Sequence, residues 1–124
     1  MKRLLLIALI ALACVGLAAG ETVATPDSVV ALPKLVDLGA GSCVPCKMMT
    51  PVLEELTQEL EGQVEIVFID VKENRAEAQK YRIRVIPTQI YYSAAGEELW
   101  RHEGYMARGD IVERMRELDM IGGE

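Results

Sequence analysis

Two cysteines separated by two residues are the part of this sequence best suited to chemistry. Cys43 and Cys46 lie in the segment GSCVPCK, residues 41–47, and the chain has one further cysteine, Cys14. A pair at this spacing has three uses: a structural disulfide, part of a metal site, or a dithiol that opens and closes in a reaction. Each use makes different demands on the rest of the chain.

The structural and metal uses are poorly supported by the other residues. A disulfide that encloses only two residues restricts the unfolded chain weakly. Structural zinc takes four ligands, and beyond the cysteine pair the chain offers one distant histidine, His102, to which we assign no role. Met48 could give Cu(I) a soft sulfur ligand, but at helical spacing we expect Met48 and Met49 in the core. Redox use is favoured, with a structural disulfide and a metal-binding or metal-delivery module as alternatives.

The backbone expected around the pair suits a redox reagent. Residues 34–41 predict a buried strand and a turn, and residues 44–61 predict a helix. Cys43 then precedes the helix, where unpaired amides and the helix dipole stabilise a thiolate. Pro45 is tolerated in the first turn. Cys46 lies one turn deeper on the same face, where it can attack a mixed disulfide formed at Cys43.

The remaining elements complete a layered domain. The pattern predicts a strand at 64–71, a helix at 73–83, a hairpin of strands at 88–94 and 98–104, and a helix at 108–118 capped by Asp110. A helix between the first two strands favours their parallel pairing, and the hairpin adds an antiparallel edge. The expected fold class is therefore α/β, a mixed central sheet with helices on both faces.

The N-terminus differs in character from the rest of the chain. Lys2 and Arg3 precede an uncharged apolar segment, residues 4–20, which is typical of an export signal. Cleavage after Gly20, retention as a membrane anchor and lipidation at Cys14 all remain open. Each outcome places the rest of the chain outside the bacterial cytoplasm, where disulfides persist.

Length and charge limit the remaining choices. The 124 residues suffice for one domain, and we expect a signal peptide or anchor at 1–20, a linker at 21–33 and the domain at 34–120. The formal net charge is −6 and the basic residues form no run, so nucleic acid is not expected as a partner.

Residues 34–118 resemble thioredoxin. LVDLGAGSCVPCKMMTPVLEEL is similar to the strand and helix of its active site, and YRIRVIPTQIYYSAAGEELWRHEGYMARGDIVERM to its C-terminal half. Asp37, Pro51 and the Ile86-Pro87-Thr88 segment keep the family spacing relative to the cysteines. The resemblance implies a thioredoxin-like fold with a shortened N-terminal strand and helix, and a thiol–disulfide oxidoreductase.

The resemblance also implies roles for individual residues. Asp37 corresponds to a buried acid that exchanges a proton with Cys46. Phe68 stands where many relatives carry a lysine near this acid, which leaves the partner of Asp37 open. Ser42 replaces the family's tryptophan before the first cysteine. The implied substrate-binding residues are Val44, Pro45, Ile86, Pro87, Thr88 and Gly104, with Pro87 as the family's cis-proline.

The direction of electron flow follows from one position. Oxidising relatives usually carry histidine where this chain has Pro45, so the resemblance implies reduction, with a periplasmic thiol oxidase as the alternative. We expect disulfide-bearing exported proteins as clients, a membrane thiol-electron donor, and no cofactor besides the Cys43–Cys46 disulfide. We expect a monomer, periplasmic or on the outer face of the cytoplasmic membrane, where residues 4–20 would anchor it if they are retained.

Overall fold

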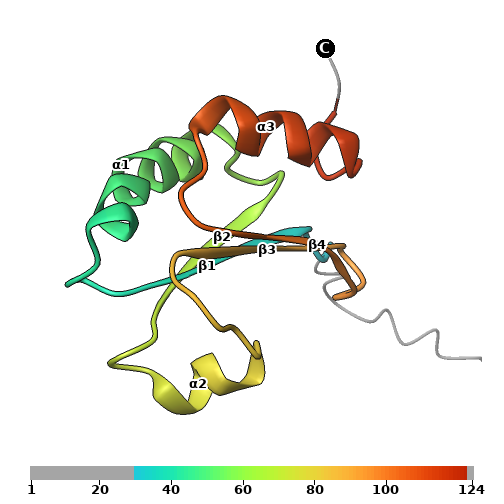
Figure 1. Cartoon of the computed structure of the whole chain (residues 1–124). Coiled ribbons are helices and arrows are strands. Elements are labelled where there is room, and N and C mark those ends of the chain that lie inside the picture. The colour runs from blue at the N-terminus through green and yellow to red at the C-terminus, as the bar shows by residue number, and fades with distance from the viewer. Residues whose placement is uncertain (1–29, 123–124) are drawn as a thin grey trace, which may run out of the picture.

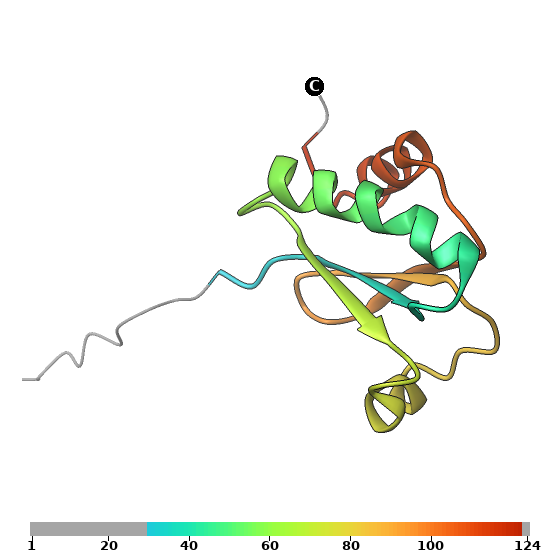
Figure 2. The same ribbon diagram turned by 90° about the vertical axis from the view of Figure 1, so that its left-hand side faces the viewer.

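The computed structural model describes residues 30–122. The expected export segment, Cys14 and most of the 21–33 linker lie outside these residues. The described part is a sheet with α-helices on both faces, as the two perpendicular views show (Figures 1 and 2). None of its helices is long and apolar enough to cross a membrane.

The elements follow one another in the order predicted from the sequence. The described strands are β1 (Lys34–Gly39), β2 (Glu65–Asp70), β3 (Thr88–Tyr92) and β4 (Glu98–Glu103), and the helices are α1 (Val44–Glu59), α2 (Arg75–Lys80) and α3 (Arg108–Glu117). The sheet order is β2-β1-β3-β4, with β1 parallel to β2 and antiparallel to β3, and β3 antiparallel to β4. The mixed sheet confirms the predicted α/β fold class.

The register of the sheet brings several connections to one end. Gly39, the last residue of β1, lies opposite Asp70, the last residue of β2. Leu38 lies opposite Thr88 at the start of β3, and Thr88 lies opposite Glu103 at the end of β4. The turn into α1, the loop before β3 and the chain after β4 therefore emerge at the same end of the sheet (Figure 2).

The sheet is buried on both faces, which explains the nearly continuous apolar run in β1. Leu35 belongs to a core cluster with Leu56 of α1 and Met115 of α3. Val36 and Leu38 belong to a second cluster that includes Ala78 of α2. Figure 1 shows α1 and α3 covering one face of the sheet and α2 covering the other.

The expectation that Met48 lies in the core is wrong. Helix α1 buries Cys46, Met49, Leu53 and Leu56, while the side chain of Met48 is 53% exposed. The buried positions follow a spacing of three and four residues from Cys46, and Met48 does not belong to this series, so its side chain lies on the exposed side of the helix.

Two helix ends also differ from the predictions. Helix α2 is shorter than 73–83, because Arg82 has a φ of 52° and a left-handed residue ends an α-helix. Asp110 is not the cap of α3. Ala107 occupies the N-cap position without a side-chain hydrogen bond. Asp110 lies inside the first turn, where its negative charge interacts favourably with the helix dipole.

Candidate active site

The cysteine pair lies at the junction between the sheet and α1. Cys43 and Cys46 form a disulfide, with their Cα atoms 5.2 Å apart. Cys43 is the N-cap residue of α1, and the backbone N–H of Cys46 donates to its Sγ atom at 3.3 Å. Cys43 is partly exposed, whereas Cys46 is 2% exposed. The pair therefore has one sulfur that a partner can reach and one that is sheltered.

The sheltered sulfur packs against the end of β1. A Cβ atom added at Gly39 would lie 3.1 Å from Cys46 Cβ, 3.3 Å from Cys46 Sγ and 3.0 Å from Phe68 Cε2. Each of these distances is tighter than an ordinary van der Waals contact, so a side chain at this position would force Cys46 or Phe68 to shift. Phe68 keeps 49% of its surface exposed, so its ring forms an apolar wall beside the disulfide.

The turn before Cys43 is fixed by β2. The Asp70 carboxylate accepts hydrogen bonds from the backbone N–H groups of Gly41 (3.0 Å), Lys72 (2.8 Å) and Glu73 (3.2 Å). The bond from Gly41 is the largest cause that holds the pKa of Asp70 below its usual value. The Lys72 Nζ atom lies 2.5 Å from Ser42 Oγ, which places a cation at the residue next to Cys43.

Asp37 lies in the layer between β1 and the helices above it. It has no exposed surface, and burial raises the pKa of its carboxyl to about 6. Gln89 Nε2 donates to Asp37 Oδ1 at 2.7 Å, which opposes that rise. Asp37 Oδ2 and Gln89 Oε1 have no hydrogen-bond partner in the part of the chain that the structure describes.

Gln89 is the residue that the sequence analysis missed. It lies directly opposite Asp37 in the antiparallel β1–β3 ladder, with both side chains on the same face of the sheet. A glutamine inside an otherwise apolar buried strand was the available signal. Phe68 lies opposite Asp37 from the other side, in β2, so the acid has an amide partner rather than a cation.

The loop before β3 reaches the same end of the sheet. The Ile86–Pro87 peptide bond is cis, as the resemblance implied. The loop is held by Thr88 Oγ1, which donates to the Val85 carbonyl (2.8 Å), and by the Gly104 N–H, which donates to the Pro87 carbonyl (2.8 Å). Within residues 30–122, Ile86 makes no backbone hydrogen bond of its own.

Apolar side chains surround these groups at the protein surface. Val44 beside Cys43 is 71% exposed, Val85 before the cis bond is 45% exposed, and Tyr105 after Gly104 is 42% exposed. Gly104 has a φ of 106°, a conformation that favours glycine. Together with Phe68, these residues give the surface near the disulfide an apolar character suited to an extended peptide.

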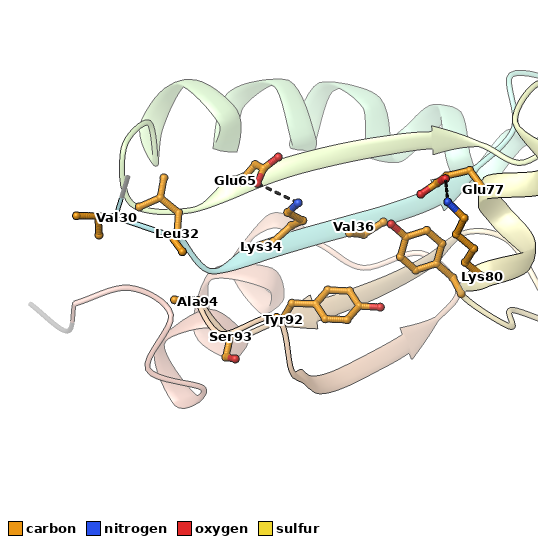
Figure 3. A pocket seen from close by; sticks show the side chains of 13 residues that line it. Val30, Leu32, Lys34, Val36, Glu65, Glu77, Lys80, Tyr92, Ser93 and Ala94 are labelled. Carbon is orange, nitrogen blue, oxygen red and sulfur yellow. Dashed lines mark hydrogen bonds and ion pairs between the residues drawn. The ribbon is translucent and has the colours of Figure 1, made fainter. Parts of the chain in front are cut away.

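A hollow of about 670 Å³ lies elsewhere, between β1, the β3–β4 turn and α2. Figure 3 shows it lined by Val36 and Tyr92, with Lys34 paired to Glu65 (3.1 Å) and Lys80 paired to Glu77 (2.6 Å). Among the described residues that line this hollow there is no cysteine. It is therefore separate from the thiol site.

The described residues do not bring other candidate metal ligands together around the cysteines. Within residues 30–122, no three His, Cys, Asp or Glu side chains are placed to hold a metal ion. His102, in β4, stacks on Trp100 with their ring centroids 5.9 Å apart.

Comparison with known proteins identifies the family. The family model for thioredoxin matches residues 21–117. A curated thioredoxin from Staphylococcus epidermidis is 41% identical over 80 residues, which are 64% of this chain and 76% of that protein. The chain belongs to the thioredoxin family. With its Cys43–Cys46 pair, this family member is a thiol–disulfide oxidoreductase.

Further relatives agree with this family. A thioredoxin from Staphylococcus aureus is 40% identical over 80 residues, again 64% of this chain and 76% of that protein. A crystal structure of chloroplastic thioredoxin z superimposes with a TM-score of 0.65 and 32% identity, over 72% of this chain and 80% of that one. A malarial protein with a TM-score of 0.64 and 17% identity, over 69% of this chain and 96% of that one, shares the fold.

Proposed function

We propose that this thioredoxin-family protein reduces disulfides in exported proteins, in the periplasm or at the outer face of the cytoplasmic membrane. The observation that carries the thiol chemistry is the position of Cys43 at the start of α1, with its Sγ atom accepting the Cys46 N–H. The same amide and the positive end of the helix stabilise a thiolate after the disulfide is reduced.

The reaction proceeds in two exchange steps. The Cys43 thiolate attacks one sulfur of the client disulfide, forms a mixed disulfide and expels the other client sulfur as a thiolate. Cys46, as a thiolate, then attacks Cys43 Sγ and releases the second client sulfur. Two electrons leave the protein's dithiol, the Cys43–Cys46 disulfide forms, and the client gains two thiols after protonation.

Asp37 is the proposed base for the second step. Cys46 must lose its proton before it attacks, and a carboxylate with a raised pKa is suited to accept that proton near neutral pH. Asp37 lies two residues before Gly39, whose Cα faces Cys46. A water molecule between acid and thiol would complete the transfer.

We propose that the cis-proline loop binds the backbone of the client protein. The unpaired main-chain groups of Ile86 can pair with an extended client backbone, while Val44, Pro45 and Gly104 border the path of the chain. Pro87 and Thr88 hold the loop in place.

A Cys46→Ser variant lacks the thiol that resolves the mixed disulfide. It should therefore accumulate mixed disulfides with clients in cells, and a failure to trap any would argue against turnover.

Pro45 favours reduction over oxidation, because the family resemblance implies that oxidising relatives usually carry histidine at that position. The test is a redox titration of the purified protein against glutathione. We expect a midpoint near that of thioredoxin, about −270 mV, and a midpoint above about −150 mV would reverse the direction. Because the periplasm is oxidising, the proposed reductase draws its electrons from a membrane thiol-electron donor.

Export is proposed from Lys2, Arg3 and the apolar residues 4–20. Cell fractionation should find the full chain in the periplasmic or membrane fraction, and a variant without residues 2–20 in the cytoplasm. The same distribution for both proteins would contradict export without touching the thiol chemistry.

A further inference from the structure

A groove of about 560 Å³ continues from the cis-proline loop toward α2. Its apolar walls include Val71, Val85 and Ile86, and three arginines, Arg75, Arg82 and Arg84, also line it. Val85 and Ile86 directly precede Pro87, so the groove adjoins the loop that is proposed to bind the client backbone. A client chain that pairs with Ile86 therefore reaches the groove within a few residues.

The charge of this groove contrasts with that of the chain. The protein carries a formal net charge of −6, yet within residues 30–122 the groove is lined by three arginines and by no acidic residue. In the described part of the chain, Arg84 has a single carboxylate neighbour, Glu103 at 3.7 Å, and the Arg84 side chain is 84% exposed. Arg75 and Arg82 have no carboxylate within 4.0 Å among the described residues. The guanidinium groups are therefore available to an external anion.

Arg82 occupies a position that suits a smaller residue. Its φ of 52° lies in the left-handed region, which glycine adopts without the steric cost that an arginine meets. Its side chain is exposed and belongs to the groove. The fold alone does not require an arginine here.

We propose that this groove binds an acidic segment of the client protein, a few residues from the disulfide that is reduced. This inference rests on the proposed reductase function and adds its substrate preference. Guanidinium groups bind carboxylates through paired N–H donors, and the valine and isoleucine walls accommodate the aliphatic part of Asp and Glu side chains. Because the groove continues from a loop suited to an extended backbone, its occupant is a peptide rather than a free anion.

The test compares two disulfide-linked peptide substrates of equal length, one with Asp and Glu near the cysteine and one with Ser and Gln. The reduced full chain should reduce the acidic peptide with the higher kcat/KM. Each of Arg75→Gln, Arg84→Gln and Arg82→Gly should lower the acidic-to-neutral ratio about two- to fivefold. Added NaCl should reduce the wild-type preference.

Arg116→Gln is the matched control, because Arg116 is an exposed arginine of α3, on the opposite face of the sheet. It should leave both rates unchanged. Arg82→Gly should not lower the melting temperature by more than the control, which separates binding from folding. If the neutral peptide is reduced but the ratio is the same in all variants, the groove inference is overturned. If the wild type reduces neither peptide, the reductase function fails and the groove inference with it.

Discussion

Asp37 is a carboxyl group that the folded protein holds in an unfavourable environment. Burial raises its pKa to about 6, against an unperturbed value near 3.8. Between these two values the unfolded chain has lost this proton while the folded chain keeps it. The free energy of unfolding therefore falls as pH rises through this window, and the loss from this group is complete above about pH 6.

The first prediction concerns stability. Asp37 should destabilise the oxidised protein by about 2 kcal/mol at pH 8 relative to pH 4. Asp37→Asn, which keeps an acceptor for Gln89, should remove most of that difference and raise stability at pH 8. Urea unfolding of both proteins at the two pH values measures it. An unchanged pH dependence in the variant would show that Asp37 is not the responsible group.

The second prediction concerns Gln89. Its hydrogen bond favours the ionised form of Asp37, so Gln89→Leu should raise the pKa of Asp37 above its value of about 6. The pH at which Cys46 resolves a mixed disulfide at half its maximal rate should rise with it. NMR titration of the Asp37 carboxyl and stopped-flow resolution at several pH values measure the two effects. If neither the pKa of Asp37 nor the pH dependence of resolution changes, the Gln89 amide does not influence the ionisation of Asp37.

At the scale of an element, replacing glycine by alanine should change the stability of the protein in opposite directions at the end of β1 and at the start of α3. Gly39→Ala forces a methyl group within 3.0 Å of Phe68 and 3.1 Å of Cys46, which should destabilise the protein by about 1–3 kcal/mol. Gly109 lies in α3, and outside its own helix turn no atom of residues 30–122 comes within 4 Å of an added Cβ, so Gly109→Ala should stabilise by about 0.5–1 kcal/mol.

Chemical denaturation of the two glycine variants measures both signs. Equal effects would contradict the close packing of β1 against α1. The Gly39 variant should also change the reactivity of Cys46, whereas the Gly109 variant should not, because Gly109 lies outside the thiol site.

The helices and strands were predictable where apolar residues recur at a regular spacing, but the residues at which they begin and end were harder to predict. Helix α1 was expected because its apolar residues recur at helical spacing, but the assignment of Met48 to the core failed because two adjacent apolar stripes were available. The end of α2 was not predictable because no glycine marks it. The residue with the left-handed conformation that ends the helix is Arg82. Such an end is set by tertiary contacts that one sequence does not display.

The site was predictable from the residues that the family resemblance marks, namely the cysteines, Asp37 and Pro87. Gln89 and Lys72 were not, because their roles depend on strand register and on the meeting of two loops. The resemblance could only suggest that Phe68 leaves Asp37 without its usual neighbour. The actual partner comes from the antiparallel strand on the other side.

At the scale of the molecule, one sheet separates two hydrophobic clusters, one under α1 and α3 and one under α2. Because the same strands contribute to both, we predict a single cooperative unfolding transition. Trp100, the chain's only tryptophan, lies against Tyr91 and below Arg114, so its fluorescence should report that transition. Fluorescence and far-ultraviolet circular dichroism should give the same urea midpoint, and separate midpoints would show that the layers unfold independently.

The most direct test of the mechanism is the rate at which Cys43 is alkylated as a function of pH. Cys46→Ser leaves Cys43 as the only thiol of the pair, and Cys14→Ser in the same chain removes the other. If the start of α1 stabilises the thiolate, the rate should reach half its maximum well below pH 8.5, the ordinary pKa of a cysteine. A midpoint at or above about 8.5 would contradict the account.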